Sequence, residues 1–171
     1  FLEVLFACQR GGFRVTPINW HLTGDNASYI VGNCEAKAFI ADVRCAELAQ
    51  LALQEHAGQL NIALAVGGAV EGFADYDDAL AGVDAENLMD PEIGAQMLYT
   101  SGTTGLPKAA VISNRRYLIS GDMAGTGGLK CKTQDRIYLC LPLYHATGLL
   151  LGVGSALATG ASMFVRRKFS A

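Results

Sequence analysis

Residues 95–108 read AQMLYTSGTTGLPK, an apolar run that passes directly into a loop of glycines and small hydroxyl residues. The run Ala95–Thr100 predicts a β-strand. Gly102 and Gly105 allow left-handed backbone angles, so the loop can turn several N–H groups inward around an anion. At about 4 Å from a phosphate oxygen, the Lys108 ammonium adds on the order of 4 kcal/mol of Coulomb attraction before desolvation. The stretch therefore predicts a phosphate-binding loop, with hydroxyl donors from Thr100, Ser101, Thr103 and Thr104.

Two common phosphate-binding motifs do not fit this sequence. A Walker A motif that began at Gly102 would need a second glycine where Pro107 stands and a Ser or Thr where Ala109 stands. The dinucleotide motif G-x-G-x-x-G fails in both Gly-x-Gly stretches, because Lys130 and Leu157 occupy the place of the last glycine. We interpret those glycines as helix-end and helix-packing residues.

Helices and strands alternate on both sides of the loop, which is typical of an α/β fold with parallel-rich sheets covered by helices. The helices that we expect are Leu2–Gln9, a helix capped by Thr23 through Asn33, a helix capped by Asp42 from Val43 to about His56, Asn114–Ala124 and Gly148–Thr159. The extended segments that we expect are Phe13–Pro17, Ala36–Ala41, Asn61–Val66, Ala95–Thr100, Arg136–Cys140 and Ala161–Val165.

The stretch Gly72–Pro91 is acidic and the least regular part of the chain. Its carboxylates lack the spacing of a calcium loop, so we interpret it as a surface connection. We place a subdomain boundary here, with one piece of the domain at residues 1–94 and a second piece, which carries the loop, at residues 95–171.

The composition is that of a globular and rather apolar protein, with 51% hydrophobic and 17% charged residues and a net charge of −3. It excludes a disordered chain and gives no basic face for nucleic acid. The five cysteines include no C-x-x-C pair, which predicts reduced thiols and a cytoplasmic protein rather than a zinc or redox site.

No Asp, Glu, Lys or Arg occurs between Ile137 and Val165. A membrane-spanning helix needs about 20 apolar residues in a row. Pro142, His145 and several glycines divide this stretch into a strand, a loop, a helix and a second strand. We therefore expect a buried core here rather than a membrane span.

Ten consecutive residues, Tyr99–Lys108, resemble the signature phosphate loop of the adenylate-forming superfamily position for position. That superfamily includes acyl-CoA synthetases, aryl-CoA ligases and luciferases. Downstream, Pro142–His145 resembles the next motif of the family, P-L-[FY]-H. The runs LPLYHATG and VRRKFSA resemble the very-long-chain acyl-CoA synthetases, also called fatty acid transport proteins, and INWHLT resembles bacterial fatty acyl-CoA synthetases.

The resemblance implies a fold, a reaction and a set of ligands. The chain would be part of the large N-terminal domain of an adenylate-forming enzyme. A fatty acid carboxylate would attack the α-phosphate of ATP, with Mg²⁺ as cofactor, and give an acyl-adenylate and pyrophosphate. The thiol of CoA would then displace AMP. An aryl-CoA ligase, another adenylating enzyme, or a fatty acid transport protein with little catalysis are the alternatives, and the last of these leaves peripheral membrane association open.

The resemblance also assigns roles to single residues. His145 would orient the carboxylate of the substrate, with a core histidine as the alternative, and Lys108 would assist the reaction at the departing pyrophosphate. Thr104 is the hydroxyl expected near Mg²⁺, which prefers oxygen ligands. The residues assigned to the β- and γ-phosphates are Thr100, Ser101, Gly102, Thr103, Thr104, Gly105 and Lys108.

Other features limit which residue roles of the family can be assigned to this chain. Many relatives have a histidine shortly after the loop, where this chain has Ser113-Asn114-Arg115-Arg116, and Asn114 is as readily a helix cap. His21 and His56 lack a motif context, and we expect them to be surface or packing residues. The ribose-binding, adenine-stacking and C-terminal lysine motifs of the family do not occur in the 171 residues, so we expect that this chain alone makes no acyl-CoA.

Overall fold

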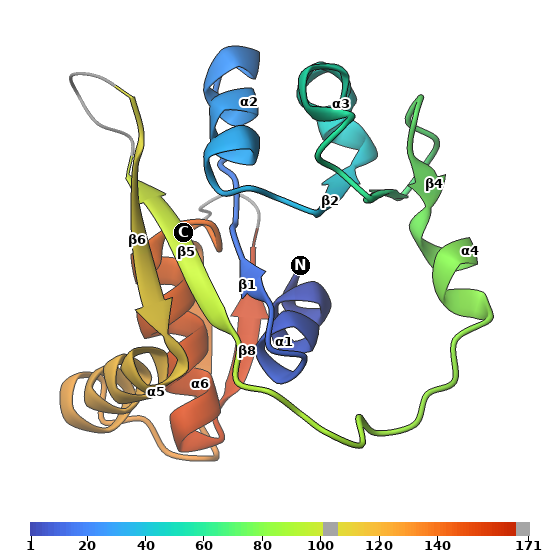
Figure 1. Ribbon diagram of the computed structural model, residues 1–171. Coiled ribbons are helices and arrows are strands. Elements are labelled where there is room, and N and C mark those ends of the chain that lie inside the picture. Colours follow the sequence, from blue (N-terminus) through green and yellow to red (C-terminus); the bar gives the residue numbers. More distant parts are fainter. Residues whose placement is uncertain (101–105, 167–171) are drawn as a thin grey trace. The chain divides into compact units, whose positions relative to one another are not determined.

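The computed structural model describes residues 1–100 and 106–166, which Figure 1 draws as coloured ribbon. These residues form two compact units. The first holds residues 1–17, 88–100 and the described residues from 109 onward. The second holds residues 18–87 and the described residues 106–108. The boundary that we placed before residue 95 concerns subdomains of a larger domain and stays a prediction.

The first unit contains two separate sheets and the helices that pack with them. A three-stranded sheet has the order β1-β5-β6, in which β1 and β5 run parallel with Arg14 opposite Ala95. A second pair, β7 and β8, is also parallel, with Arg136 opposite Ser162. The elements are α1 (Leu2–Arg10), β1 (Arg14–Val15), β5 (Ala95–Thr100), β6 (Lys108–Ser113), α5 (Asn114–Asp122), η2 (Met123–Gly128), β7 (Arg136–Leu139), η3 (Thr147–Val153), α6 (Gly154–Thr159) and β8 (Ser162–Val165).

The second unit is a smaller parallel sheet of order β2-β3-β4, accompanied by helices. Its helices α2 and α3 pack on each other, because the Gln59 side chain that follows α3 donates to the carbonyls of Val31 and Ala36 at 2.9 Å and 3.1 Å. The elements are α2 (Gly24–Asn33), β2 (Ala38–Asp42), η1 (Val43–Cys45), α3 (Ala46–His56), β3 (Ile62–Val66), β4 (Ala74–Asp75) and α4 (Tyr76–Ala81).

The α/β class and the parallel sheets agree with the sequence prediction, while several local details differ. Asp42 does act as a cap, but a short 3₁₀ turn precedes α3, and the Asp42 carboxylate accepts from the Arg44 N–H. Ser113, not Asn114, caps α5, since its Oγ accepts the Arg116 N–H at 3.3 Å. The acidic stretch is partly regular, because the Asp75 carboxylate caps α4 by accepting from the N–H groups of Asp77 and Asp78.

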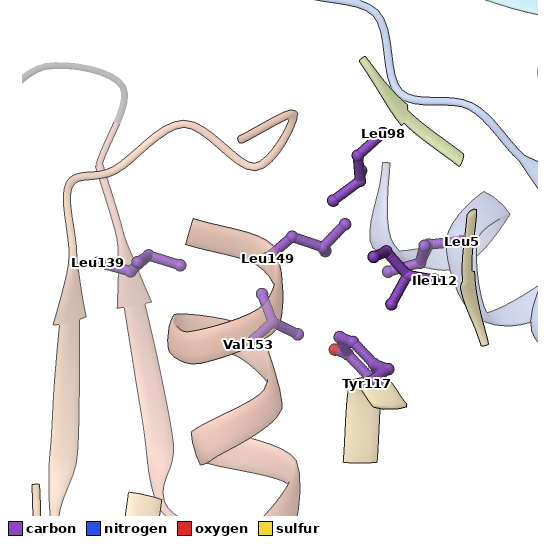
Figure 2. Close-up of a cluster of buried hydrophobic side chains, with 7 residues drawn as sticks. All are labelled: Leu5, Leu98, Ile112, Tyr117, Leu139, Leu149 and Val153. Atoms are coloured by element: carbon purple, nitrogen blue, oxygen red, sulfur yellow. The ribbon is translucent and has the colours of Figure 1, made fainter. Parts of the chain in front are cut away.

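The core of the first unit is a cluster of buried side chains that come from both of its sheets and from the helices between them. Figure 2 shows these side chains pointing toward one another. The stretch Ile137–Val165, which has no charged residues, contributes Leu139, Leu149 and Val153, in agreement with the buried core that we expect there. Among the described residues, no helix combines the length and the apolar character needed to cross a bilayer. The cluster consists of Leu5, Leu98, Ile112, Tyr117, Leu139, Leu149 and Val153.

Gly121 and Gly154 allow the backbones of α5 and α6 to come into direct contact. A Cβ placed on Gly121 would lie 2.5 Å from the carbonyl carbon of Gly154 and 2.6 Å from its oxygen. Next to this contact, the Ser155 Oγ donates to the Gly121 carbonyl at 3.4 Å. Both glycines are buried, so the close approach leaves no space for a side chain.

We predict that Gly121→Ala destabilises the protein although alanine favours helices. The helix gain is about 1 kcal/mol, whereas a methyl group forced against a backbone carbonyl costs about 1–3 kcal/mol and must move α6. Denaturant unfolding should show a net loss of up to about 2 kcal/mol. Gly127→Ala is the matched control, because nothing lies within 4 Å of its Cβ position. Equal changes in the two variants would contradict this account.

Tyr117 gives a second prediction, which concerns pH. The residue is 1% exposed, its hydroxyl has no hydrogen-bond partner in the described structure, and burial raises the pKa of Tyr117 to about 12. The unfolded chain releases this proton at about pH 10 while the folded protein keeps it, so stability falls between about pH 10 and about pH 12. Tyr117→Phe should match or exceed the wild type at about pH 8, since the lost hydroxyl is unpaired.

The difference between Tyr117→Phe and the wild type should then widen in favour of the variant at about pH 11, because phenylalanine has no proton to lose. Unfolding free energies measured at both pH values test this. Parallel curves for the two proteins would show that this side chain does not titrate with folding.

Candidate functional site

The two ends of the predicted phosphate loop lie on neighbouring strands of one sheet. Thr100 is the last residue of β5 and Lys108 is the first residue of β6, and both are exposed. In Figure 1 the arrows of these strands point in opposite directions, so β5 and β6 run antiparallel. The remaining loop residues assigned to phosphate or Mg²⁺ lie outside the described residues, namely Ser101, Gly102, Thr103, Thr104 and Gly105.

Strand β5 gives this loop a buried support. Its burial alternates, with Gln96 and Leu98 inside, and it pairs in parallel with β1. Thr100 follows at the carboxyl end of that parallel pair. In open α/β sheets, ligands bind at this end of the strands. The described backbone therefore places the start of the loop where a nucleotide site is expected, and the assignment of each loop residue to phosphate stays a prediction.

The P-L-Y-H motif forms a tight turn after β7. The backbone N–H of His145 donates to the carbonyl of Pro142 at 3.1 Å, which closes the four residues into a β-turn. Proline suits the start of this segment because it fixes its own backbone angle and needs no donor there.

The same histidine begins the helical segment that follows. Its carbonyl accepts the N–H of Leu149 at 3.0 Å, and its ring Nδ1 accepts the N–H of Thr147 at 3.3 Å. These bonds satisfy two of the N–H groups that a helix start leaves without partners. The residue is exposed in the described structure, and its role at the carboxylate stays a prediction.

Gly148 explains why the turn and the helix can meet at this place. A Cβ on Gly148 would lie 2.3 Å from the carbonyl oxygen of Pro142, which is closer than any real contact. Only glycine therefore lets the turn pack on the helix and hold His145 at its start. Residues 142–148, PLYHATG, thus act as one structural unit.

The other two histidines behave as expected for surface and packing residues. His21 is exposed and its ring lies 3.5 Å from the ring of Trp20. His56 packs between α2 and α3, where its Nε2 lies 2.9 Å from the carbonyl oxygen of Ser28. A Cβ on Gly32 would come within 2.6 Å of the His56 ring, so the ring rests directly on the neighbouring helix.

Metal and thiol chemistry find little support in the part of the chain that the structure describes. It holds no group of three or more His, Cys, Asp or Glu side chains arranged to bind a metal. All five cysteines are free thiols. Burial raises the pKa of the Cys8 thiol, which keeps it protonated and a poor nucleophile.

Curated relatives match almost the whole of this chain. A medium/long-chain fatty acid–CoA ligase from Mycobacterium tuberculosis is 32% identical over 98% of the chain and 28% of its own length. Long-chain fatty acid transport protein 1 from Bos taurus is 32% identical over 100% and 28%. An indoleacetate–CoA ligase from Aromatoleum aromaticum is 30% identical over 99% and 34%. The chain therefore spans about a third or less of the length of these relatives.

A solved structure and a family match agree with these relatives. ATP-bound MatB from Rhodopseudomonas palustris superposes with a TM-score of 0.69 at 24% identity, over 98% of this chain and 38% of that one, which shows a shared fold. The AMP-binding enzyme family matches residues 1–171. Fold, motifs and relatives lead to one conclusion: the chain belongs to the AMP-binding enzyme family, as part of its large N-terminal domain.

Proposed function

We propose that the protein that carries this chain activates a fatty acid with ATP and transfers the acyl group to CoA. The single observation that carries the proposal is the sequence YTSGTTGLPK, whose ends the fold places on neighbouring strands. Relatives named as fatty acid–CoA ligase and fatty acid transport protein support the fatty acid as substrate.

In the first step, a carboxylate oxygen attacks the α-phosphate and the bond to pyrophosphate breaks. Negative charge grows on the departing group, and fixed donors aimed at it lower the barrier. Lys108 supplies a full positive charge at one end of the loop, and the Thr100 hydroxyl lies at the other end. In the second step, the CoA thiol attacks the acyl carbon and AMP leaves.

Mg²⁺ would neutralise charge on the phosphate oxygens. The ligand that the sequence of the loop offers is the Thr104 hydroxyl. Mg²⁺ commonly keeps several waters and binds substrate phosphates through one or two protein oxygens. A loop of hydroxyl residues fits this pattern, with most ligands coming from the nucleotide and from water.

An aryl acid is the second candidate substrate, because the indoleacetate–CoA ligase is nearly as similar as the fatty acid enzymes. A comparison of kcat/KM for palmitate and indoleacetate separates the two. We propose a cytoplasmic enzyme, because none of its five cysteines forms a disulfide. The names of the fatty acid transport proteins support a further proposal of peripheral membrane contact.

We predict that Lys108→Ala lowers ATP–pyrophosphate exchange in the full-length protein by roughly 100-fold or more, since it removes a cation at the departing group. Lys132→Ala is the control, because Lys132 is also an exposed lysine but lies far along the chain from the loop. Its exchange rate should stay within about twofold of the wild type. If Lys108→Ala and Lys132→Ala were equally active, the role of the loop would be wrong.

A further inference from the structure

Gln96 is a buried polar residue of strand β5. The residue is 1% exposed, and its amide Oε1 and Nε2 are both buried without a hydrogen-bond partner among the described residues. The amide Nε2 of Gln9, in α1, is buried and unpartnered in the same way. A buried amide that gives up its hydrogen bonds to water destabilises the fold unless another partner replaces them. Native proteins therefore give nearly all such groups a partner.

The backbone directs Gln96 toward α1. The N–H of Gly94 donates to the carbonyl of Gln9 at 2.9 Å, and a Cβ on Gly94 would lie 2.9 Å from the Gln9 Cα. The Gly94 position therefore faces α1. Gly94, Gln96 and Leu98 are all buried, while the residues between them are only partly buried. Because residues two apart along a strand share a face, Gln96 lies on the α1 side of β5 as well.

Helix α1 brings Gln9 to the same place. Leu5 and Gln9 are four residues apart, so they lie on one face of the helix. Leu5 belongs with Leu98 to the buried core cluster (Figure 2), and Gln9 contacts Gly94. The helix and the strand therefore run in opposite directions. Four helical residues and two strand residues each span about 6–7 Å, so the two glutamines are neighbours beside the two leucines.

We propose that Gln9 and Gln96 form a buried hydration site, in which ordered water bridges the two amides and joins α1 to β5. Gln96 offers an acceptor oxygen and two N–H donors, and the Gln9 nitrogen offers two further donors. Water both donates and accepts, and a buried water commonly bonds to about three protein groups. The N–H groups would repel a metal ion, and the amide oxygen would repel an anion.

The site supports a strand rather than a reaction. Gln96 is the second residue of β5, whereas Thr100, where the phosphate loop begins, is its last residue. The bridge would fix the start of this strand to α1, in a layer next to the leucine contact. It does not depend on the substrate proposed above.

A high-resolution crystal structure of the full-length protein tests the occupant directly. Density for a water should lie within hydrogen-bond distance of the Gln9 amide and of the Gln96 amide. A direct hydrogen bond between the two amides would overturn the proposal, and so would two amides with no water between them.

Replacement of Gln96 by methionine tests the energetic role of the site. Methionine has a similar length but no amide, so Gln96→Met leaves the Gln9 amide and the water without a partner. The thermal midpoint of the full-length protein should fall by about 2–4 °C. Gln54→Met is the control, because Gln54 is exposed on α3, and its midpoint should change by less than about 1 °C. A midpoint raised by Gln96→Met would show that the amide has no partner in the fold, and the proposal would be wrong.

A double variant tests whether the two glutamines share the site. When Gln9 and Gln96 are both methionine, no amide is left without its partner. The double variant should therefore lose less than the sum of the two single variants. Strictly additive losses would show that each glutamine acts alone, which would contradict a shared water.

Discussion

The strand that precedes the phosphate loop and the helix that follows His145 are fixed to one another by a shared hydrophobic contact. Leu98 lies two residues before Thr100, and Leu149 lies four residues after His145, and both belong to one buried cluster (Figure 2). A buried leucine of this kind stabilises a fold by about 2–5 kcal/mol when compared with alanine. The positions of both motifs within the first unit therefore depend on this core.

Much of the fold could be predicted from the sequence, because apolar periodicity and alternation determine most of the elements. The parallel sheets and the α/β class follow from strands that alternate with helices. The exact helix starts could not be predicted. Ser113 and Asn114 are equally good caps by residue type, and only the structure shows that the Ser113 Oγ accepts the Arg116 N–H. The sequence predicts an irregular stretch around Asp75, because α4, the helix that Asp75 caps, has only 6 residues.

For the candidate site, the sequence proposes residue types but not their contacts. The motifs make Lys108 and His145 candidates because their neighbours form runs that chance rarely produces. The hydrogen bond from the Thr147 N–H to the imidazole could not be predicted from the sequence. Its donor is a backbone N–H group, which every residue type except proline has. The one signal in the sequence is Gly148, three residues after His145. Its role becomes clear only from the structure, where a Cβ on Gly148 would collide with the Pro142 carbonyl oxygen.

That close approach also bears on how variation in such proteins should be interpreted. Gly148 carries no group that could bind or react, yet any side chain there would push the preceding turn away and swing the imidazole with it. We therefore expect Gly148 to be conserved as strictly as His145. A survey that ranks residues by the chemistry of their side chains alone would overlook Gly148, although a substitution there would displace His145.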